Sequence, residues 1–216
     1  MGVSKIKTPD FFTRKTLKSA YWAGFIAADG YVSKKTNQIG VSLSSKDHKH
    51  LCKFAKELGI KVRTRWRQTS LSPDIRSFSE IAFSSKQMKE ELAMIYNVVS
   101  NKSFILKPPV NLEAKLLKAY LKGLIDGDGS ILLKHKSTAI YLRFKIVGSY
   151  AICKFIKNYI ESNYNLETNT KINPKKKIFS FEIVGRPARI FLEDLKKLRT
   201  PELERKWSRV SKTNRK

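Results

Sequence analysis

Two copies of one ten-residue pattern each end in an aspartate followed by a glycine. Tyr21–Gly30 reads YWAGFIAADG and Tyr120–Gly129 reads YLKGLIDGDG, so the aspartates Asp29 and Asp128 lie 99 residues apart. If the two segments are neighbours in the fold, the carboxylates repel each other unless a cation lies between them. Oxygen ligands of this kind suit Mg²⁺ together with phosphate. A single copy is more simply an Asp-Gly turn after a buried helix, but the repetition favours a metal site.

Both copies predict the end of a helix that has one face almost without side chains. Gly24 and Ala28 are four residues apart, as are Gly123 and Gly127, and residues at that spacing share a helix face. Small residues on one face let two helices approach closely. We therefore expect the two helices to pack against each other and to bring the two aspartates together at their C-terminal ends.

The elements that must position these helices also recur in one order. The first copy predicts a helix at 16–28, two strands of which the second spans 36–45, a helix at 47–58, strands at 61–67 and 75–84, and a helix at 86–96. The second copy predicts a helix at 112–127 capped by Asn111, strands at 130–135 and 138–147, a helix at 149–163, strands at 166–173 and 177–184, and helices at 187–198 and 201–211.

The predicted fold is therefore of the mixed α/β (α+β) class. It has two αββαββα halves related by a pseudo-twofold axis, each with an antiparallel β-saddle, and the halves join through the two packed helices. We place the halves at residues 1–106 and 112–216, with a short proline-containing linker at 107–111.

The chain is strongly basic along its whole length. It has 44 Lys and Arg residues against 18 Asp and Glu residues, a formal net charge of +26. Residues 1–110 carry 20 basic and 8 acidic residues, and residues 111–216 carry 24 and 10. Such a charge indicates a polyanionic partner, and duplex nucleic acid offers a phosphate ladder along which both halves could lie. The 41% of hydrophobic residues excludes a wholly disordered basic tail.

The sequence predicts a soluble protein of a reducing compartment, such as a prokaryotic cytoplasm or an organelle matrix. Its longest segments without a charged residue have ten residues, about half of what a bilayer span needs. The first residues have no apolar segment of signal-peptide length, and two cysteines cannot form a disulfide framework. Cys52 and Cys153 occupy equivalent places in the two copies, which favours small packing residues over a metal pair.

The two decapeptides resemble the two signature helices of LAGLIDADG homing endonucleases, in the single-chain form with two motifs, and the resemblance covers about residues 14–210. It implies a site-specific DNA endonuclease that acts as a monomer without a protein partner. It also implies a staggered double-strand break with 3′ overhangs in a long, non-palindromic DNA target.

In that family the last acidic residue of each motif binds the catalytic metals. The resemblance thus implies that Asp29 and Asp128 bind Mg²⁺, or Mn²⁺ in its place. The main-chain carbonyls of Ala28 and Gly127 also contribute. The first acidic position of the motif, Asp126 in the second copy, is alanine in the first copy, and this position is variable in the family and is not a metal ligand.

The resemblance further implies basic and polar residues around the metals. A lysine that follows the last helix of each half corresponds to Lys102 and to Lys206. The polar residue at the end of the second strand, often a glutamine in the family, falls near Ser45, with Lys46 beside it, and near Ser149 in the second half. Because that glutamine is missing, the group that positions water is left open. The catalytic candidates are Asp29, Asp128, Lys102, Lys206, Lys46 and Ser45.

Polar and basic residues on the exposed sheet faces are the candidates for reading DNA. Strands of ten residues extend about 33 Å, which is about ten base pairs, and a twisted antiparallel ribbon fits the major groove. Arginines suit guanine edges and lysines suit phosphates. The candidates in the first half are Lys34, Asn37, Gln38, Arg63, Arg65, Arg67, Gln68 and Arg76, and those in the second half are Lys134, Lys136, Arg143, Lys145, Thr170, Lys171, Asn173, Lys175 and Lys177.

Other functions are compatible with part of this pattern. An intron RNA maturase or a non-cleaving DNA-binding regulator would keep the fold, but would have no catalytic reason to keep both Asp29 and Asp128. A non-specific basic protein would bind any duplex without target preference. A zinc-dependent nuclease needs a Cys/His cluster, which the sequence does not suggest, and we expect His48, His50 and His135 to be surface groups.

Overall fold

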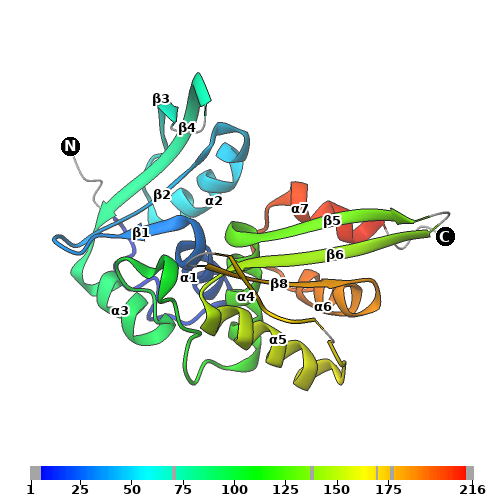
Figure 1. Cartoon of the computed structure of the whole chain (residues 1–216). Coiled ribbons are helices and arrows are strands. Elements are labelled where there is room, and N and C mark those ends of the chain that lie inside the picture. Colours follow the sequence, from blue (N-terminus) through cyan, green and yellow to red (C-terminus); the bar gives the residue numbers. More distant parts are fainter. Residues whose placement is uncertain (1–5, 70–71, 137–138, 169, 176–177, 213–216) are drawn as a thin grey trace.

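The computed structural model describes residues 6–69, 72–136, 139–168, 170–175 and 178–212. The first half contains, in chain order, α1 (Leu17–Asp29), β1 (Gly30–Val32), β2 (Gln38–Ser44), η1 (Ser45–Asp47), α2 (His48–Leu58), β3 (Arg63–Thr69), β4 (Ser72–Ser84), α3 (Lys86–Tyr96) and η2 (Lys102–Phe104). The second half contains α4 (Ala114–Asp128), β5 (Gly129–Lys136), β6 (Ala139–Gly148), α5 (Tyr150–Tyr164), β7 (Asn173–Lys175), β8 (Ile178–Val184), α6 (Arg186–Lys196) and α7 (Glu204–Ser211). Figure 1 shows α1 and α4 at the centre of the molecule, with the strands of the two halves extending from them in different directions.

The strands of each half form one antiparallel sheet of four strands. The order is β1-β2-β4-β3 in the first sheet and β5-β6-β8-β7 in the second, and every neighbouring pair is antiparallel. The two sheets therefore have the same topology. This arrangement confirms the predicted mixed α/β class with two related halves.

Helices α1 and α4, the central helices, approach so closely that their backbones touch. A Cβ atom added at Gly24 would lie 2.0 Å from a carbonyl oxygen of α4, and one added at Gly123 would lie 1.9 Å from a carbonyl oxygen of α1. Nearer to the C-terminal ends, a Cβ atom at Gly127 would lie 2.2 Å from the Ala28 Cβ. Larger residues could not occupy these positions without separating the helices.

The N-terminus of α1 is fixed by a capping box between Thr16 and Ser19, in which each side chain satisfies a backbone N–H of the other residue. From there to its last turn the helix is buried. Its Trp22 ring stacks on Phe54 of α2 with ring centroids 4.4 Å apart. The central helix is thus held both by its partner helix and by the aromatic core of its own half.

Alternation along the strands gives each sheet a core face and an open face. In the first sheet Ile39 and Val41 of β2 lie opposite Phe83 and Ile81 of β4, and all four are buried. The residues between them point to the other face. The second sheet repeats the pattern, with buried side chains at Ile131, Leu142, Phe144, Ile146, Phe181 and Ile183.

The strand predicted at 166–173 is wrong, because Asn173 is the one described residue of that range in a strand. The Thr168 N–H and hydroxyl both donate to the Glu161 carboxylate of α5, and the Thr168 carbonyl accepts from the Lys157 ammonium. These side-chain bonds occupy the backbone groups that a strand would pair.

The cap predicted at Asn111 is also wrong. The residue before the first turn of α4 is Glu113. Asn111 itself has a φ of 55°, so it forms a left-handed turn ahead of the helix. A short polar side chain tolerates that conformation, which explains why the asparagine stands near a helix start without capping it.

The interpretation of the histidines as surface groups fails for His50, which is 4% exposed. Its ring lies against Trp22 and Phe25 of α1, and its Nε2 lies 3.0 Å from the Tyr21 hydroxyl. Burial lowers the pKa of His50 to about 3, so the ring is neutral. His135 is exposed, as predicted.

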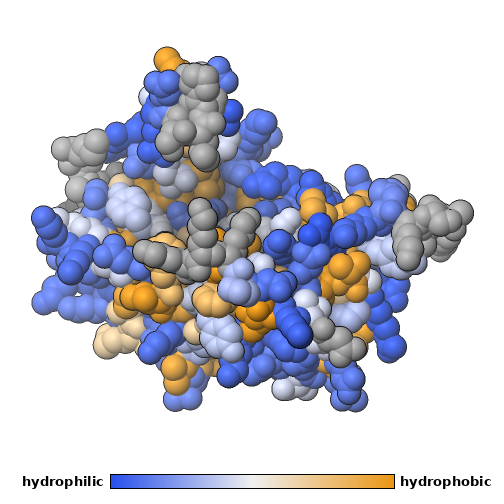
Figure 2. All heavy atoms as spheres, in the orientation of Figure 1, coloured by the Kyte–Doolittle hydropathy of each residue, from blue (hydrophilic) through white to orange (hydrophobic). Residues whose placement is uncertain are grey.

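Hydrophilic side chains cover much of the surface shown in Figure 2, including the projecting β3–β4 hairpin. In the part of the chain that the structure describes, no helix has the length and apolar character needed to cross a membrane.

Candidate functional site

The two repeated aspartates lie at the adjoining C-terminal ends of the central helices. Asp29 is the last residue of α1 and Asp128 is the last residue of α4, and each precedes the first residue of a strand. The tight contact between Gly127 and Ala28 falls one residue before each aspartate, so the two ends meet. Both aspartates are exposed, and a ligand can therefore reach them.

The protein around this pair disfavours its negative charge. Burial by neighbouring atoms raises the pKa of Asp29, while Lys206 and Lys102 act to lower it. Burial also raises the pKa of Asp128 to about 6, and the charge of Asp29 adds to this effect. Two adjacent carboxylates with raised pKa values form a site whose charged state a bound cation would stabilise.

Lys102 and Lys206 bind the carbonyl groups at the ends of the same helices. The Lys102 Nζ donates to the Gly30 carbonyl oxygen at 2.5 Å and to that of Ala28 at 3.4 Å. The Lys206 Nζ lies 2.5 to 3.2 Å from the carbonyl oxygens of Ile125, Asp126, Gly127 and Gly129. Each ammonium therefore opposes the partial negative charge of a helix end.

These two lysines are buried, and burial lowers the pKa of each. The charges of Asp29 and Asp128 raise both pKa values in return. The structure thus brings four of the six catalytic candidates together in one site, where two carboxylates lie near two ammonium groups.

Asp126 is a component of the site that sequence reasoning did not include. Its buried carboxylate accepts hydrogen bonds from the Tyr21 hydroxyl at 2.5 Å, from the Leu203 N–H at 2.9 Å and from the Trp207 Nε1–H at 2.7 Å. Tyr21 lies on α1, whereas Leu203 and Trp207 belong to the segment that contains Lys206. Asp126 therefore ties this segment to both central helices. The available signal was a carboxylate on the turn of α4 that otherwise carries the apolar and small residues Leu124, Ile125 and Gly127.

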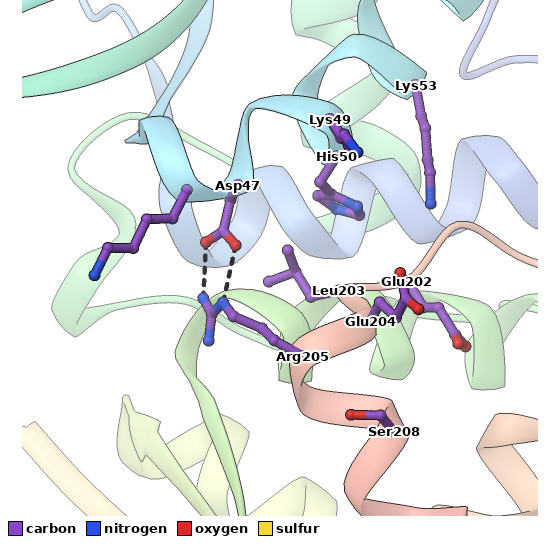
Figure 3. Close-up of a pocket in the computed structure, with 10 residues that line it drawn as sticks. Asp47, Lys49, His50, Lys53, Glu202, Leu203, Glu204, Arg205 and Ser208 are labelled. Carbon is purple, nitrogen blue, oxygen red and sulfur yellow. Dashed lines mark hydrogen bonds and ion pairs between the residues drawn. The ribbon is translucent and has the colours of Figure 1, made fainter.

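The two other catalytic candidates lie in η1. Lys46 is exposed, and the Ser45 hydroxyl is buried without a hydrogen-bond partner in the described part of the chain. No hydrogen bond or ion pair between described residues joins either side chain to the two aspartates. They lie beside Asp47, whose carboxylate pairs with Arg205 of the other half. Figure 3 shows this pair at a pocket of about 400 Å³ between α2 and the start of α7.

The donor set fits a hard divalent cation that keeps some of its coordination positions for ligands from outside the protein. Among the described residues no group of three or more His, Cys, Asp and Glu side chains could enclose a metal ion. Two carboxylates with nearby carbonyl oxygens leave coordination positions for water and phosphate, as Mg²⁺ sites commonly do. The residues that would hold the ion are Asp29 and Asp128, with the carbonyl oxygens of Ala28 and Gly127.

The open face of the first sheet carries several of the predicted DNA-contacting residues, namely Gln38, Arg63, Arg65, Arg67 and Arg76. The Arg65 Nε lies 2.8 Å from the Glu80 carboxylate. The Arg67 guanidinium lies 4.3 Å from the centre of the Phe78 ring and donates to the Ser42 hydroxyl at 3.0 Å. Neighbouring side chains thus hold these two arginines in defined orientations.

The other candidates of the first half have different positions. Lys34 and Asn37 are exposed in the turn between β1 and β2. Gln68 follows Arg67 in β3, so it points to the opposite face of the sheet. The register of the strands therefore separates Gln68 from the arginines with which it was grouped.

In the second sheet Lys134, Arg143 and Lys145 share the open face. The Arg143 guanidinium pairs with Glu182 of β8 at 2.5 Å. Lys136 is the last residue of β5, and Asn173 and Lys175 are the first and last residues of β7. In the segment before β7, Thr170 is half-buried and Lys171 is exposed. Lys177 lies outside the described residues.

Comparison with known proteins gives both a sequence match and structural matches. Residues 16–96 match the sequence model of a LAGLIDADG-like domain. No curated protein matches the sequence. The sequence match covers α1 to α3, which is the first half up to its last long helix.

Three solved structures share the fold of the whole chain. The homing endonuclease I-WcaI, bound to its DNA recognition sequence, has a TM-score of 0.61 and 13% identity over 92% of this chain and 90% of that chain. The N-terminal LAGLIDADG domain of DUF199/WhiA has a TM-score of 0.53 and 17% identity over 92% and 96%. Full-length DUF199/WhiA from Thermatoga maritima has a TM-score of 0.52 and 17% identity over 91% of this chain, which spans 60% of that protein. The chain therefore matches a LAGLIDADG-like domain over residues 16–96 and shares the fold of these solved structures along both halves.

Proposed function

We propose that the chain is a DNA endonuclease that makes a staggered double-strand break at a specific, long and non-palindromic site. One observation carries the proposal: Asp29 and Asp128 lie at the touching ends of α1 and α4, at the junction of two halves whose sheets have basic open faces. Each half would contribute one aspartate, and each would act on one DNA strand. The cofactor would be Mg²⁺, with Mn²⁺ as an alternative, and the protein would act as a monomer.

The residues of the site would share the work of phosphodiester hydrolysis. A divalent cation held by the two aspartates would stabilise the charge that develops on the phosphate and activate a water molecule. The carboxylates would bind the cation, and its positive charge would offset the unfavourable free energy of holding two negative charges at this site. Lys102 and Lys206 would keep the helix ends neutralised so that the Ala28 and Gly127 carbonyl oxygens stay in place.

Basic side chains on the open faces would bind the duplex. An arginine already held in place, as Arg67 is over Phe78, loses less conformational entropy on binding and suits a bidentate contact to guanine. Lysines such as Lys134 and Lys145 suit phosphate contacts. Because the two sheets carry different residues, the two halves would read different base sequences.

The relatives support DNA binding, since I-WcaI has the same fold and is bound to its DNA recognition sequence. DUF199/WhiA also has this fold, and its name states no nuclease activity. A non-cleaving DNA-binding protein is therefore the second candidate function. Two exposed carboxylates whose charge the surrounding protein disfavours are unfavourable for DNA binding alone, and this favours cleavage.

Selection from a randomised duplex library in Mg²⁺ tests the proposal. The wild-type chain should cut a discrete set of sequences. Asp29→Asn and Asp128→Asn should each lower double-strand cleavage at least roughly 100-fold, because a ligand of the cation is lost. Both variants should still bind the selected duplex in a mobility-shift assay, since the open faces of the sheets are unchanged.

Asp10→Asn is the matched control, because it removes a surface carboxylate that pairs with Arg14 away from the site. It should cut as the wild type does. Undiminished cutting by either site variant would contradict the aspartate assignment. Selective binding by the wild type without any cutting would instead support the second candidate.

A further inference from the structure

The N-terminal end of α2 makes a contact that crosses to the second half. Asp47 occupies the N-cap of α2, where an aspartate usually accepts from the N–H groups of its own helix, but its side chain makes no such bond. Its carboxylate instead accepts from the Arg205 Nε and Nη2, each at 2.8 Å. Arg205 belongs to α7 and directly precedes Lys206. Figure 3 shows the two side chains meeting end to end.

The N-terminal end of α5 makes a corresponding contact in the other direction. Ser149 is the N-cap of α5 and accepts from the Ile152 N–H at 3.2 Å. Its hydroxyl also donates to the Leu106 carbonyl oxygen of the first half at 2.5 Å. The Leu106 N–H in turn donates to the Lys102 carbonyl oxygen at 2.8 Å. Ser149 therefore holds the short turn that carries Lys102.

We propose that Asp47 and Ser149 are positioning residues, each of which holds the lysine of the opposite half over its helix end. Asp126 ties the segment of Lys206 to α4, and the anchor of Arg205 on the first half completes the position of Lys206 over the helix end. Lys102 stays on the end of α1 because the turn after it is anchored to the second half. We call these two interactions the cross-half contacts. The position of each lysine thus depends on the half to which it does not belong.

The two cross-half contacts differ in their physical nature. The Asp47–Arg205 pair is ionic, and the Arg205 side chain is 56% exposed, so salt screens it. The Ser149 contact is buried and neutral, so salt has little effect on it. A rise in ionic strength should therefore release Lys206 and leave Lys102 in place.

Lysine acetylation measures these positions without DNA or metal. The full-length protein is treated with N-hydroxysuccinimidyl acetate, and modification of each lysine is followed by mass spectrometry. Asp47→Asn should raise the acetylation rate of Lys206 roughly fivefold and leave that of Lys102 unchanged. Ser149→Ala should do the reverse. A rise in NaCl concentration from about 0.05 M to about 0.5 M should increase the acetylation rate of Lys206 and leave that of Lys102 unchanged.

The chain offers a matched control for each change. Asp10→Asn removes a second bidentate aspartate–arginine pair that lies within the first half. Ser85→Ala removes the cap of α3, which accepts from the Met88 N–H as Ser149 accepts from its own helix. Neither control should change the acetylation rate of Lys102 or of Lys206. Ser149→Thr keeps the hydroxyl and should restore the wild-type rate.

The proposal would be overturned if, in variants that still unfold cooperatively, the acetylation rates of both lysines rose together or neither rate rose. The function of the contacts rests on the proposed endonuclease activity and has its own measurement. Asp47→Asn and Ser149→Ala should slow cleavage at saturating DNA while DNA affinity stays constant. A protein that cuts no DNA would refute the proposed function, and the acetylation pattern would still decide whether the two residues position the lysines.

Discussion

At the scale of single residues, the site concentrates groups that the fold does not favour. Asp29 and Asp128 are negative charges at helix ends that are already partly negative, and the pKa of each is raised by burial. Lys102 and Lys206 are buried cations satisfied by backbone carbonyls. The stability of the protein should therefore respond to the removal of any one of these charges.

Asp128→Asn should stabilise the metal-free protein at neutral pH. The pKa of Asp128 is about 6 in the fold and 3.8 in its ordinary state, so the folded protein binds more protons between these values and its stability falls as the pH rises through them. Above pH 7 the variant should gain about 1 kcal/mol in free energy of unfolding, less than the whole shift because the side chain is exposed. Near pH 4 the gain should vanish.

Urea unfolding in chelator between pH 4 and pH 8 measures this effect. Asp10 has a pKa lowered by its hydrogen bond to Arg14, so Asp10→Asn should show no gain at neutral pH. A gain in Asp128→Asn that does not depend on pH would contradict the argument.

Lys206→Met should cost more stability than Lys102→Met. The first change leaves the carbonyl groups of Ile125, Asp126, Gly127 and Gly129 without the ammonium, whereas the second affects those of Ala28 and Gly30. We expect the free energy of unfolding to fall by about 3 kcal/mol in Lys206→Met and by about 1.5 kcal/mol in Lys102→Met. Both variants lose charged hydrogen bonds, and Lys206→Met leaves more carbonyl acceptors unpaired. Chemical unfolding at pH 7 gives both values, and equal losses would argue against the larger capping role of Lys206.

At the scale of elements, the junction of the halves depends on the absence of side chains on two helices. Gly24→Ala and Gly123→Ala would place a methyl group about 2 Å from backbone atoms of the facing helix. Each should cost at least about 3 kcal/mol, because the backbone cannot move aside as a side chain can. Gly148→Ala is the control, since its nearest neighbour would lie at 3.9 Å, and it should cost under about 1 kcal/mol. Thermal unfolding of the three variants makes the comparison.

The elements that the sequence predicts well are those fixed by local patterns. Helix α3 spans Lys86–Tyr96 as predicted, because Ser85 caps it and Asn97 ends it in a left-handed turn. The strand expected at 166–173 failed because Glu161 and Lys157 bind Thr168 from the side. Alternation of residue types could not reveal that competition, since it arises only after α5 packs beside the segment.

At the scale of the whole molecule, the charge of +26 predicts how the protein should bind DNA. If basic residues on both open faces contact phosphates, the logarithm of the binding constant should fall with the logarithm of salt concentration with a slope of about −6 or steeper. Fluorescence anisotropy with a duplex of about 20 base pairs measures the slope. A slope near that of a single contact would mean that only a small part of one sheet binds.

The candidate site was predictable to the extent that it repeats. Asp29 and Asp128 stand out because the same context occurs twice, and small residues on both helices indicate that they meet. The contact of Asp47 with Arg205 joins residues 158 positions apart. The corresponding contact of Ser149 in the other half is not an ion pair, so no repeated sequence pattern predicts the Asp47–Arg205 pair. Asp126 occupies a position that is alanine in the first copy, so repetition does not point to it, and only the three donors that surround it in the fold reveal its role.

The contact between Tyr21 and Asp126 also determines which halves can pair. Ala27 stands in the first copy where Asp126 stands in the second, and the hydroxyl of Tyr120, the counterpart of Tyr21, is buried without a hydrogen-bond partner in the described part of the chain. In a pair of two first halves each Tyr21 hydroxyl would lose the Asp126 carboxylate and keep only the His50 ring of its own half, and two second halves would bring two copies of the buried Asp126 carboxylate into one junction. Although the halves descend from one pattern, their junction discriminates against self-association, as the interface of an obligate heterodimer does, and a single chain keeps the two unlike partners together.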